Sequence, residues 1–452
     1  MLKTTKFFAL IIIFLFTLKV FTSDSKISSS NIAVYDQLFP EKTVVTTTGE
    51  QSFGPAIPRL GMPLPEPEFP LEQRVTPVSM PAEIRGVYVT GWGAGSSSLF
   101  QRLLHFTEET GINSLVIDIK DDTGFLSYQS RIPKVNTLQS WKLKIPNPYR
   151  LLQTLKQRNI YPIARLVVFK DPFLAETRPD LALKAKNGDI WRDYKGLAWV
   201  DPHSKEVWEY NMEIAKEAIC LGFPEIQFDY VRFASDGDLS NCVYPHSEGK
   251  SKEDVIKEFL LYAREELEPL GAVISADVFG LACSAADDLR IGQKLEKIAE
   301  AVPVISPMVY PSHYAKGSYG LGNPDLFPYE TVLQSMKDAS RRLDGYPVKL
   351  RPWLQDFSLG SKYGKKQIEA QIQAVYDAGV RDWIFWNPSC RYEIEKYLTK
   401  SYRSAEVLVG RPEQAEEEEF VTPSQVNALS EKMITTSESP PREETLIESD
   451  GK

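Results

Sequence analysis

The sequence predicts a (β/α)8 TIM barrel of the α/β class, with N- and C-terminal flanks outside the folded core. Three observations lead to this prediction. Eight short apolar runs alternate with amphipathic stretches over roughly 320 residues, the length of a barrel with long loops. Nearly every run carries a polar side chain near its C-terminal end. Both ends of the 452-residue chain lack a periodic apolar pattern.

The predicted strands are short runs rich in Val, Ile and aromatic residues. They are residues 84–90, 114–120, 161–169, 225–229, 273–277, 302–308, 348–354 and 383–386. Helical patterns lie between them, for example at 205–221, 251–270, 288–301 and 365–378. A doubly wound open sheet is the alternative. Residues 91–95, which follow the first run, lack the full Gly-rich dinucleotide-binding pattern, and this favours the barrel.

The two flanks have different compositions. A basic start followed by the apolar run 7–18 predicts an export signal or a membrane anchor over residues 1–23, because this run is short for a bilayer span of about 20 residues. Residues 24–83 are rich in Ser, Thr and Pro and are interpreted as a linker. The barrel is predicted over 84–402, and residues 403–452 as an acidic disordered tail. We therefore expect an exported protein, periplasmic, extracellular or anchored at the cell envelope.

Charge and cysteine content exclude several classes of protein. The net charge of -9 and pI near 5.3 argue against a nucleic-acid partner and favour a neutral or weakly charged substrate. Four cysteines are too few for a disulfide framework; Cys242 and Cys283 could form a bridge, or all four could be free thiols. The Cys and His residues do not have zinc-ligand spacing. Neither a metal nor a cofactor is predicted, and the sequence gives no oligomeric state.

Side-chain alternation sorts each strand into an inward and an outward set. In run 348–354 the apolar parity faces the helices, which leaves Arg351, Trp353 and Gln355 facing inward. The same sorting gives the remaining inward residues: Tyr88, Thr90, Asp118, Lys120, Arg165, Gln227, Asp229, Ser275, Asp277, Ser306, Met308, Tyr310, Phe385 and Asn387. Buried charges are costly in a purely structural core, so the polar set indicates an active site at the C-terminal mouth. A buried ion-pair network is the structural alternative.

Asp229 and Asp277 are the leading catalytic carboxylates. Each ends a predicted strand, and neighbouring strands lie about 4.8 Å apart, which predicts carboxyl groups roughly 5 Å apart. A retaining glycoside hydrolase uses this spacing, whereas an inverting pair needs roughly 6.5 to 9.5 Å. Arg165 or Arg232 would keep Asp229 ionised as a nucleophile, and a raised pKa on Asp277 would suit a general acid.

Other carboxylates compete for the second role. Asp356 follows the seventh strand, and Asp118 lies in a cluster with Asp121 and Asp122 after the second. The cluster could bind a hard cation, although it lacks the EF-hand spacing. Asp118 and Lys120 are preferred as substrate-binding groups.

Aromatic residues at strand ends are suited to pack against sugar rings. The binding residues predicted from all these patterns are Asp118, Lys120, Arg165, Gln227, Arg232, Tyr310, Trp353, Gln355, Asp356 and Trp386. The four His residues form no triad pattern, and the sequence has no Gly-x-Ser-x-Gly elbow.

Several motifs together resemble one family. They are Arg85-Gly86-Val87-Tyr88-Val89-Thr90, Val116-Ile117-Asp118-Ile119-Lys120-Asp121, Phe228-Asp229-Tyr230-Val231-Arg232-Phe233, Ala276-Asp277-Val278-Phe279-Gly280, Met308-Val309-Tyr310-Pro311-Ser312-His313-Tyr314 and Arg351-Pro352-Trp353-Leu354-Gln355-Asp356. Over residues 85–402 the chain resembles bacterial glycoside hydrolases of unknown specificity (domain of unknown function 4015), distant relatives of the α-amylase and α-galactosidase barrels.

The resemblance implies a TIM barrel with a nucleophilic Asp at the end of strand four, which falls on Asp229. The acid of the distant relatives comes from strand five or six. Here strand five supplies Asp277, whereas strand six ends at Tyr310 without a carboxylate. The implied partner is a carbohydrate. A barrel that binds envelope polysaccharide without cleaving it is the alternative function, and only the enzyme requires Asp229 and Asp277 to lie close together.

Overall fold

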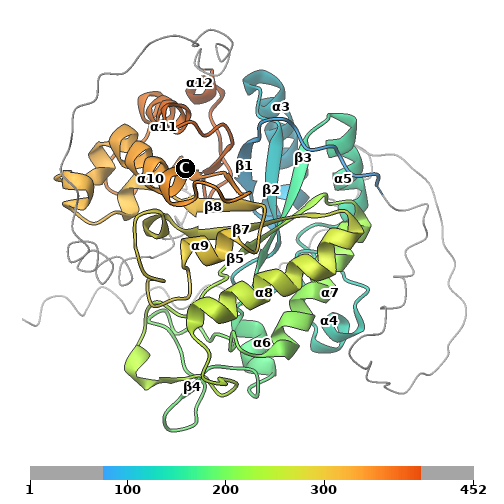
Figure 1. The fold of residues 1–452 in the computed structure, drawn as a ribbon. Helices are drawn as coiled ribbons and strands as arrows, with labels where there is room; N and C mark the ends of the chain where they lie inside the picture. The colour runs from blue at the N-terminus through green and yellow to red at the C-terminus, as the bar shows by residue number, and fades with distance from the viewer. Residues whose placement is uncertain (1–74, 399–452) are drawn as a thin grey trace, which may run out of the picture. The chain divides into compact units, whose positions relative to one another are not determined.

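The computed structural model describes residues 75–398, and these form a barrel of eight parallel strand positions surrounded by helices (Figure 1). The barrel strands are β1 (Arg85–Val89), β2 (Ser114–Lys120), β3 (Tyr161–Val167), β5 (Glu225–Asp229), β7 (Val273–Phe279), β8 (Val304–Met308), β9 (Lys349–Leu350), β10 (Trp353–Gln355) and β11 (Trp383–Trp386). All eight predicted strands are present, and the barrel prediction is confirmed.

The barrel closes at the seventh strand position, where β10 pairs with β11 on one side and with β8 on the other. The order is β10-β11-β1-β2-β3-β5-β7-β8-β9, and β10 also pairs with β8. The seventh position is split into β9 and β10 at Arg351-Pro352, because proline has no N–H to donate to a neighbouring strand. Every barrel pairing is parallel, so all C-terminal strand ends meet at one mouth.

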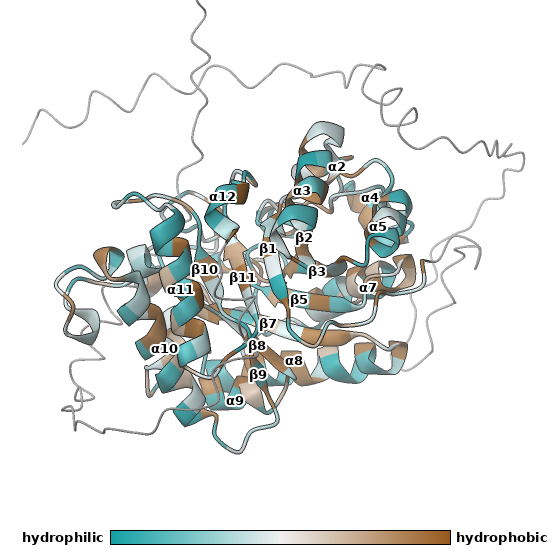
Figure 2. Ribbon diagram, turned by 90° about the horizontal axis from the view of Figure 1, so that it is seen from above, coloured by the Kyte–Doolittle hydropathy of each residue, from teal (hydrophilic) through white to brown (hydrophobic). Residues whose placement is uncertain are grey.

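Helices follow the strands and cover the outside of the barrel. They are α2 (Gly91–Gly95), α3 (Ser97–Thr110), α4 (Pro133–Leu138), α5 (Pro148–Gln157), α6 (Pro172–Thr177), α7 (Lys205–Leu221), α8 (Lys252–Leu267), α9 (Leu295–Ala299), α10 (Pro328–Arg342), α11 (Lys365–Asp377) and α12 (Ile394–Tyr397). The helical pattern predicted over 288–301 is realised only as α9. In Figure 2 the strands lie at the centre, and helices with both brown and teal segments lie around them, as expected of amphipathic helices.

Sequence signals explain where the long helices begin and end. The Ser204 side chain accepts a hydrogen bond from the Val207 N–H at the start of α7, and Ser251 accepts one from Asp254 at the start of α8. Gly111 follows α3 with a φ of 71°, a left-handed conformation that glycine adopts without a Cβ penalty.

Short elements complete the loops at the mouth. The segment after β3 and the segment after β5 form a two-stranded antiparallel sheet from β4 (Lys184–Ala185) and β6 (Cys242–Val243). Single 3-10 turns lie at Leu239–Asn241, Glu268–Leu270, Gly280–Cys283, Pro311–His313, Ser318–Gly320 and Pro324–Leu326.

A bulge in β2 changes the direction of its last side chain. Asp118 pairs with Arg165 and Lys120 with Leu166, so Ile119 is an extra residue between them. An extra residue in one strand reverses the alternation of side chains beyond it. Asp118 and Lys120 therefore face opposite sides of the sheet, although simple alternation places both inside.

The segment before β1 packs against the barrel. Val75 and Val78 are buried, and the Val75 N–H donates to the Leu221 carbonyl at 3.4 Å. The Asn113 side chain donates to the Glu83 carbonyl. Residues 75–83, assigned to the linker from their composition, thus contact the folded core.

Residues 1–74 and 399–452 lie outside the described part of the chain, and with them the predicted export signal, most of the linker and the acidic tail. Within residues 75–398, none of the helices is long and apolar enough to cross a bilayer.

Candidate active site

Asp229 and Asp277 lie side by side at the C-terminal mouth. Phe228 of β5 is opposite Ala276 of β7, so the two aspartates that follow are at the same height on neighbouring strands. Asp229 is 5% exposed and Asp277 is 1% exposed. Two carboxylates that are so deeply buried from solvent repel each other strongly unless a cation or a proton neutralises one of them.

Arg165 of β3 supplies that cation. Its Nε lies 3.1 Å from Asp229 Oδ2 and 3.8 Å from Asp277 Oδ2, and its Nη2 also bonds Asp229. Its Nη1 lies 2.5 Å from Asp118 Oδ1. The separation of the two Oδ2 atoms therefore cannot exceed the sum of the two Nε distances. This bound includes the spacing of a retaining pair, about 5 to 5.5 Å, and also the lower end of the inverting range.

The two oxygens of Asp277 have different surroundings. Oδ1 accepts a hydrogen bond of 2.7 Å from Trp353 Nε1 on β10. Oδ2 is buried and has no hydrogen-bond partner within residues 75–398. Burial raises the pKa of Asp277 well above its usual value, and the neighbouring Asp229 raises it further. A carboxyl group that stays protonated and has an unused oxygen is suited to general-acid chemistry.

Asp118 holds Arg165 from the far side of the pair. Its Oδ1 accepts from Arg165 and its Oδ2 from the Tyr88 hydroxyl. Burial raises the pKa of Asp118 to about 6. Asp118 thus lies in the same group as the catalytic candidates, bonded to a protein cation.

Aromatic rings from four strand ends cover one side of the mouth. Tyr310 stacks on Trp386 with ring centroids 5.3 Å apart, and Phe357 contacts both edge to face. Tyr88 packs against Trp353 and Trp386. The predicted residues Tyr310, Trp353 and Trp386 are brought together here. Phe357 was not predicted, because it lies in a loop where strand parity gives no direction.

The comparisons with known proteins fit this geometry. The model of the family with domain of unknown function 4015, described as "Putative glycosyl hydrolase domain", matches residues 86–392. The chain belongs to this family. None of the curated proteins matches the chain.

Two solved structures are similar to parts of this chain. The PgaB (BpsB) glycoside hydrolase domain from Bordetella bronchiseptica is 14% identical, with 68% of this chain and 95% of that chain covered and a TM-score of 0.51. A hypothetical protein from Ruminiclostridium thermocellum ATCC 27405 is 46% identical over 42% of this chain and 97% of that chain, with a TM-score of 0.40. The PgaB likeness, at this identity, shows the fold alone. The family match makes the barrel a glycosidase with a carbohydrate substrate.

Gln227 and Arg351 of the glycosyl hydrolase domain face the barrel interior and bond partners other than Asp229 and Asp277. Gln227 donates to Ser306 at 3.0 Å and is fully buried. Arg351 forms an ion pair with Glu225, the first residue of β5, and both side chains are fully buried. The expectation that Arg351 lines the mouth is wrong, because Glu225 holds it at the opposite end of β5 from Asp229. The parity of Gln227 and Asp229 also applies to Glu225, so this residue could have been found from the sequence.

Lys120 lies outside the barrel interior. Its Nζ is 2.7 Å from Asp171 Oδ2, 2.9 Å from the Val167 carbonyl and 3.1 Å from Asn211 Oδ1 of α7. Lys120 and Asp171 are fully buried. The inward direction predicted for Lys120 is wrong, because the bulge at Ile119 reverses it. The structure does not bring Lys120 together with Asp118.

Gln355 and Asp356 at the end of β10 hold neighbouring segments. Gln355 accepts from the Ser312 N–H at 3.1 Å and donates to the Phe357 carbonyl at 3.0 Å. Asp356 points toward α12, where Tyr397 donates to it at 2.9 Å and Lys396 lies 3.3 Å away. Burial raises the pKa of Asp356 to about 6. Asp356 thus bonds α12, and the ion pairs that join Arg165 to Asp229 and Asp277 do not include it.

The acidic cluster after β2 is divided among three cations. Asp118 bonds Arg165, Asp121 lies 2.5 Å from Lys144, and Asp122 lies 3.3 Å from Lys170. Among residues 75–398 there is no group of three or more His, Cys, Asp or Glu side chains placed to hold a metal ion. None of the four cysteines, all within residues 75–398, forms a disulfide, so the structure has no Cys242–Cys283 bridge.

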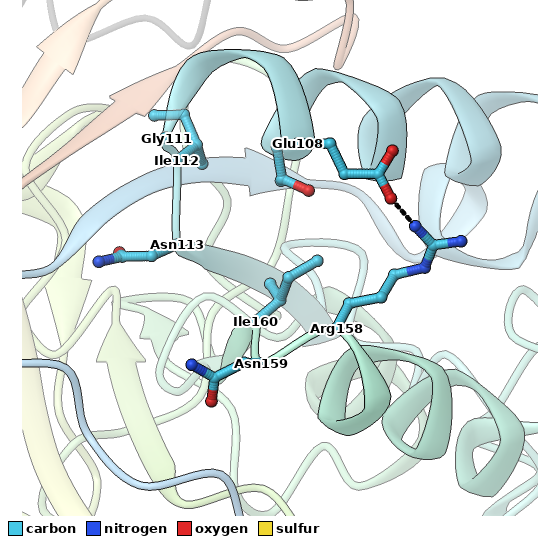
Figure 3. Close-up of a pocket in the computed structure, with 8 residues that line it drawn as sticks. Glu108, Gly111, Ile112, Asn113, Arg158, Asn159 and Ile160 are labelled. Carbon is cyan, nitrogen blue, oxygen red and sulfur yellow. Dashed lines mark hydrogen bonds and ion pairs between the residues drawn. The ribbon is translucent and has the colours of Figure 1, made fainter.

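A cavity of about 220 Å³ lies at the other end of the barrel (Figure 3). Its lining comes from the segments that enter β2 and β3: Thr107, Glu108, Gly111, Ile112, Asn113, Arg158, Asn159 and Ile160. Figure 3 shows Glu108 and Arg158 paired across it. Because it faces the N-terminal strand ends, this cavity is not the site of the two catalytic candidates.

Proposed function

We propose that this glycosyl hydrolase domain cleaves O-glycosidic bonds of a poly- or oligosaccharide with retention of configuration. Asp229 is the nucleophile and Asp277 is the acid/base. The observation that carries the proposal is the pair itself. Two buried carboxyl groups stand at equal height, with Arg165 bonded to Asp229, and with one oxygen of Asp277 left without a hydrogen bond.

The contacts divide the two roles. Asp229 Oδ2 accepts two hydrogen bonds from Arg165, and Oδ1 accepts one of 2.5 Å from the Tyr230 N–H. Donors of this kind stabilise a carboxylate, the form that attacks a sugar. Among residues 75–398, Asp277 accepts a hydrogen bond from Trp353 alone, and its raised pKa favours the protonated form that a leaving group needs.

Each step balances in protons and bonds. Asp229 attacks the anomeric carbon while the Asp277 proton moves from Oδ2 to the glycosidic oxygen, so the leaving sugar departs as an alcohol and a glycosyl ester forms on Asp229. Water then attacks the same carbon, and Asp277 takes one of its protons. The ester breaks, the sugar leaves with its original configuration, and both aspartates return to their starting states.

Asp229→Asn should lower the turnover of an active substrate by at least about 10³-fold, because the amide is a poor nucleophile in the same shape. Hydrolysis of a panel of glycosides and cell-wall polymers measures this, with circular dichroism to check the fold. Asp356→Asn is the matched control, a buried carboxylate at the same face that contacts α12. Near-normal activity in Asp229→Asn, or an inverted product by NMR, would contradict the assignment.

Asp277→Asn should slow substrates with poor leaving groups by about 10²- to 10⁴-fold and spare those with good ones. A leaving group that departs unaided needs no proton. Rates with a series of aryl glycosides of increasing leaving-group pKa measure the difference. An equal loss for all leaving groups would show that Asp277 is not the acid. Saturable polysaccharide binding without any cleavage would favour the non-catalytic alternative.

The N-terminal sequence supports a further part of the proposal. We propose that the barrel works outside the cytoplasm, because a basic start and the apolar run 7–18 are typical of an export signal or anchor. Cell fractionation with an antibody against the barrel tests this, and recovery in the cytoplasmic fraction alone would contradict it.

A further inference from the structure

Arg232 is a buried cation next to the proposed nucleophile. The chain leaves β5 at Asp229 through Tyr230, whose φ of 51° lies in the left-handed region that non-glycine residues seldom adopt. Val231 then enters the core, and Arg232 is 4% exposed. Strained backbone of this kind is often found where a loop must place a functional side chain.

Three aromatic rings surround the guanidinium. Its central carbon lies 4.9 Å from the ring centre of Trp199, 5.0 Å from Tyr230 and 4.7 Å from Phe279. These rings come from the loop after β3 and from the C-terminal ends of β5 and β7, so Arg232 lies on the mouth side of the barrel. Cation–π contacts attract the guanidinium to this place but do not neutralise its charge.

Arg232 has no carboxylate within 4 Å in residues 75–398, although it is deeply buried. Toward the described part of the chain, only Nη1 among its nitrogen atoms donates, to the Phe233 carbonyl and to Ser235 Oγ, both at 3.0 Å. Burial lowers the pKa of Arg232. A buried charge without a counter-ion is destabilising, and Arg165 and Arg351 both have a counter-ion. Nε and Nη2 thus remain available to donate in parallel to one planar or tetrahedral anion.

The nearest acidic groups are already occupied or distant. Asp193 accepts from the N–H groups of Lys195 and Leu197 and from the Trp199 indole. Asp236 accepts from the backbone of Tyr194, and burial together with Asp193 raises its pKa.

A second cation reinforces the positive charge here. Lys170 Nζ lies 4.9 Å from the centre of the same Tyr230 ring and pairs with the half-exposed Asp122 at 3.3 Å. Two cations therefore lie within 5.0 Å of the centre of the Tyr230 ring.

We propose that Arg232 binds an acidic group, a carboxylate or a sulfate ester, on a sugar ring next to the bond that is cleaved. The inference rests on the proposed function, because it takes the sugar to lie over Asp229 and Asp277. The substrate is then an acidic glycan, and one carboxylate or sulfate group of the bound sugar contacts Arg232.

Matched pairs of oligosaccharides test the proposal. Trisaccharides of galactose, glucose and mannose are compared with the corresponding uronic acids and with sulfated forms, by titration calorimetry on the full chain carrying Asp229→Asn. At least one acidic member should bind roughly tenfold or more tightly than its neutral counterpart, the gain expected from a charge-assisted hydrogen bond. The carboxylate and sulfate arms show which anion is preferred.

Arg232→Met should reduce the preference for the acidic member to within about twofold, and Arg232→Lys should retain part of it because it keeps the charge. Arg381→Met is the matched control, since Arg381 lies 5.4 Å from the Tyr376 ring centre at the opposite end of the barrel. Thermal melting checks that each variant folds. A preference unchanged in Arg232→Met, or the absence of binding by every acidic member, overturns the proposal.

Hydrolysis of the same pairs separates the two proposals. If Asp229→Asn abolishes turnover while Arg232→Met keeps the acidic preference, the anion site fails and the catalytic pair stands. If acidic sugars bind through Arg232 and turnover survives in Asp229→Asn, the catalytic assignment fails and the anion site stands.

Discussion

A single indole N–H distinguishes the two oxygens of Asp277. Trp353 Nε1 donates to Oδ1, so a proton on this carboxyl group is best carried by Oδ2. Oδ2 is also the oxygen that faces Arg165, at 3.8 Å, and through it the Asp229 carboxylate. Trp353 is therefore a positioning residue in the proposed mechanism, because it orients the acid and lowers the pKa of Asp277 against the larger effect of burial.

Trp353→Phe should move the basic limb of the pH profile of kcat/KM to higher pH. The acid works when protonated, so activity falls as pH rises through the raised pKa of Asp277. The indole N–H stabilises the carboxylate, and its removal raises that pKa further. Trp386→Phe is the control, because Trp386 stacks on Tyr310 nearby. A basic limb that stays in place, or that moves to lower pH, would contradict this role.

At the scale of the elements, the inward side chains of the barrel form layers, one structural and one proposed to be catalytic. Glu225 at the start of β5 pairs with Arg351 between β9 and β10, and Ser275 and Tyr161 also donate to Glu225. This layer joins strands four, seven, five and three. At the other end of β5, Asp229 stands in the proposed catalytic layer. The alternative that buried charges are structural thus holds for one layer of the barrel.

Glu225→Gln or Arg351→Met alone should lower the free energy of unfolding by about 3–5 kcal/mol, because each leaves a buried charge without its partner. The double variant should recover much of this loss. Urea denaturation measures the changes. Removing Arg264 from its exposed pair with Glu268 is the control and should cost at most about 1 kcal/mol. Single variants within this small range would show that the pair is not isolated from water.

At the scale of the whole molecule, the folded core begins before the first strand. Val75 packs over Gly222 at the end of α7, where a Cβ on the glycine would lie 2.5 Å from the Val75 carbonyl oxygen. Val78 belongs to the cluster inside the barrel with Ile84, Tyr161 and Ile163. Residues of the predicted linker thus fill the N-terminal end of the barrel, opposite the proposed active site.

Val75→Ala and Val78→Ala in the full chain should each lower the free energy of unfolding by about 1.5 kcal/mol, since each deletes two buried carbon groups of about 0.8 kcal/mol. Chemical denaturation measures the loss. Val243→Ala is the matched control, because Val243 is 40% exposed in β6. Losses no larger than that of the control would restore the folded boundary to residue 84.

Local sequence alone determined the barrel fold and the position of Asp229 and Asp277 at the C-terminal ends of its strands. The alternation of apolar runs with helical patterns is set residue by residue, and two aspartates that end neighbouring parallel strands must meet at one mouth. The same parity correctly turned Asp118, Arg165 and Trp353 inward.

Only the tertiary structure decided which inward charges lie next to Asp229 and Asp277. Lys120 left the interior because one extra residue in β2 reversed its direction, and this depends on the pairing with β3. Arg351 and Asp356 found partners in Glu225 and Lys396, which are 126 and 40 residues away. Arg232 is distinguished by its surroundings, because none of residues 75–398 places a carboxylate within 4 Å of it. A sequence specifies directions along a strand, whereas the partner of a buried charge is fixed only when distant strands and loops pack together.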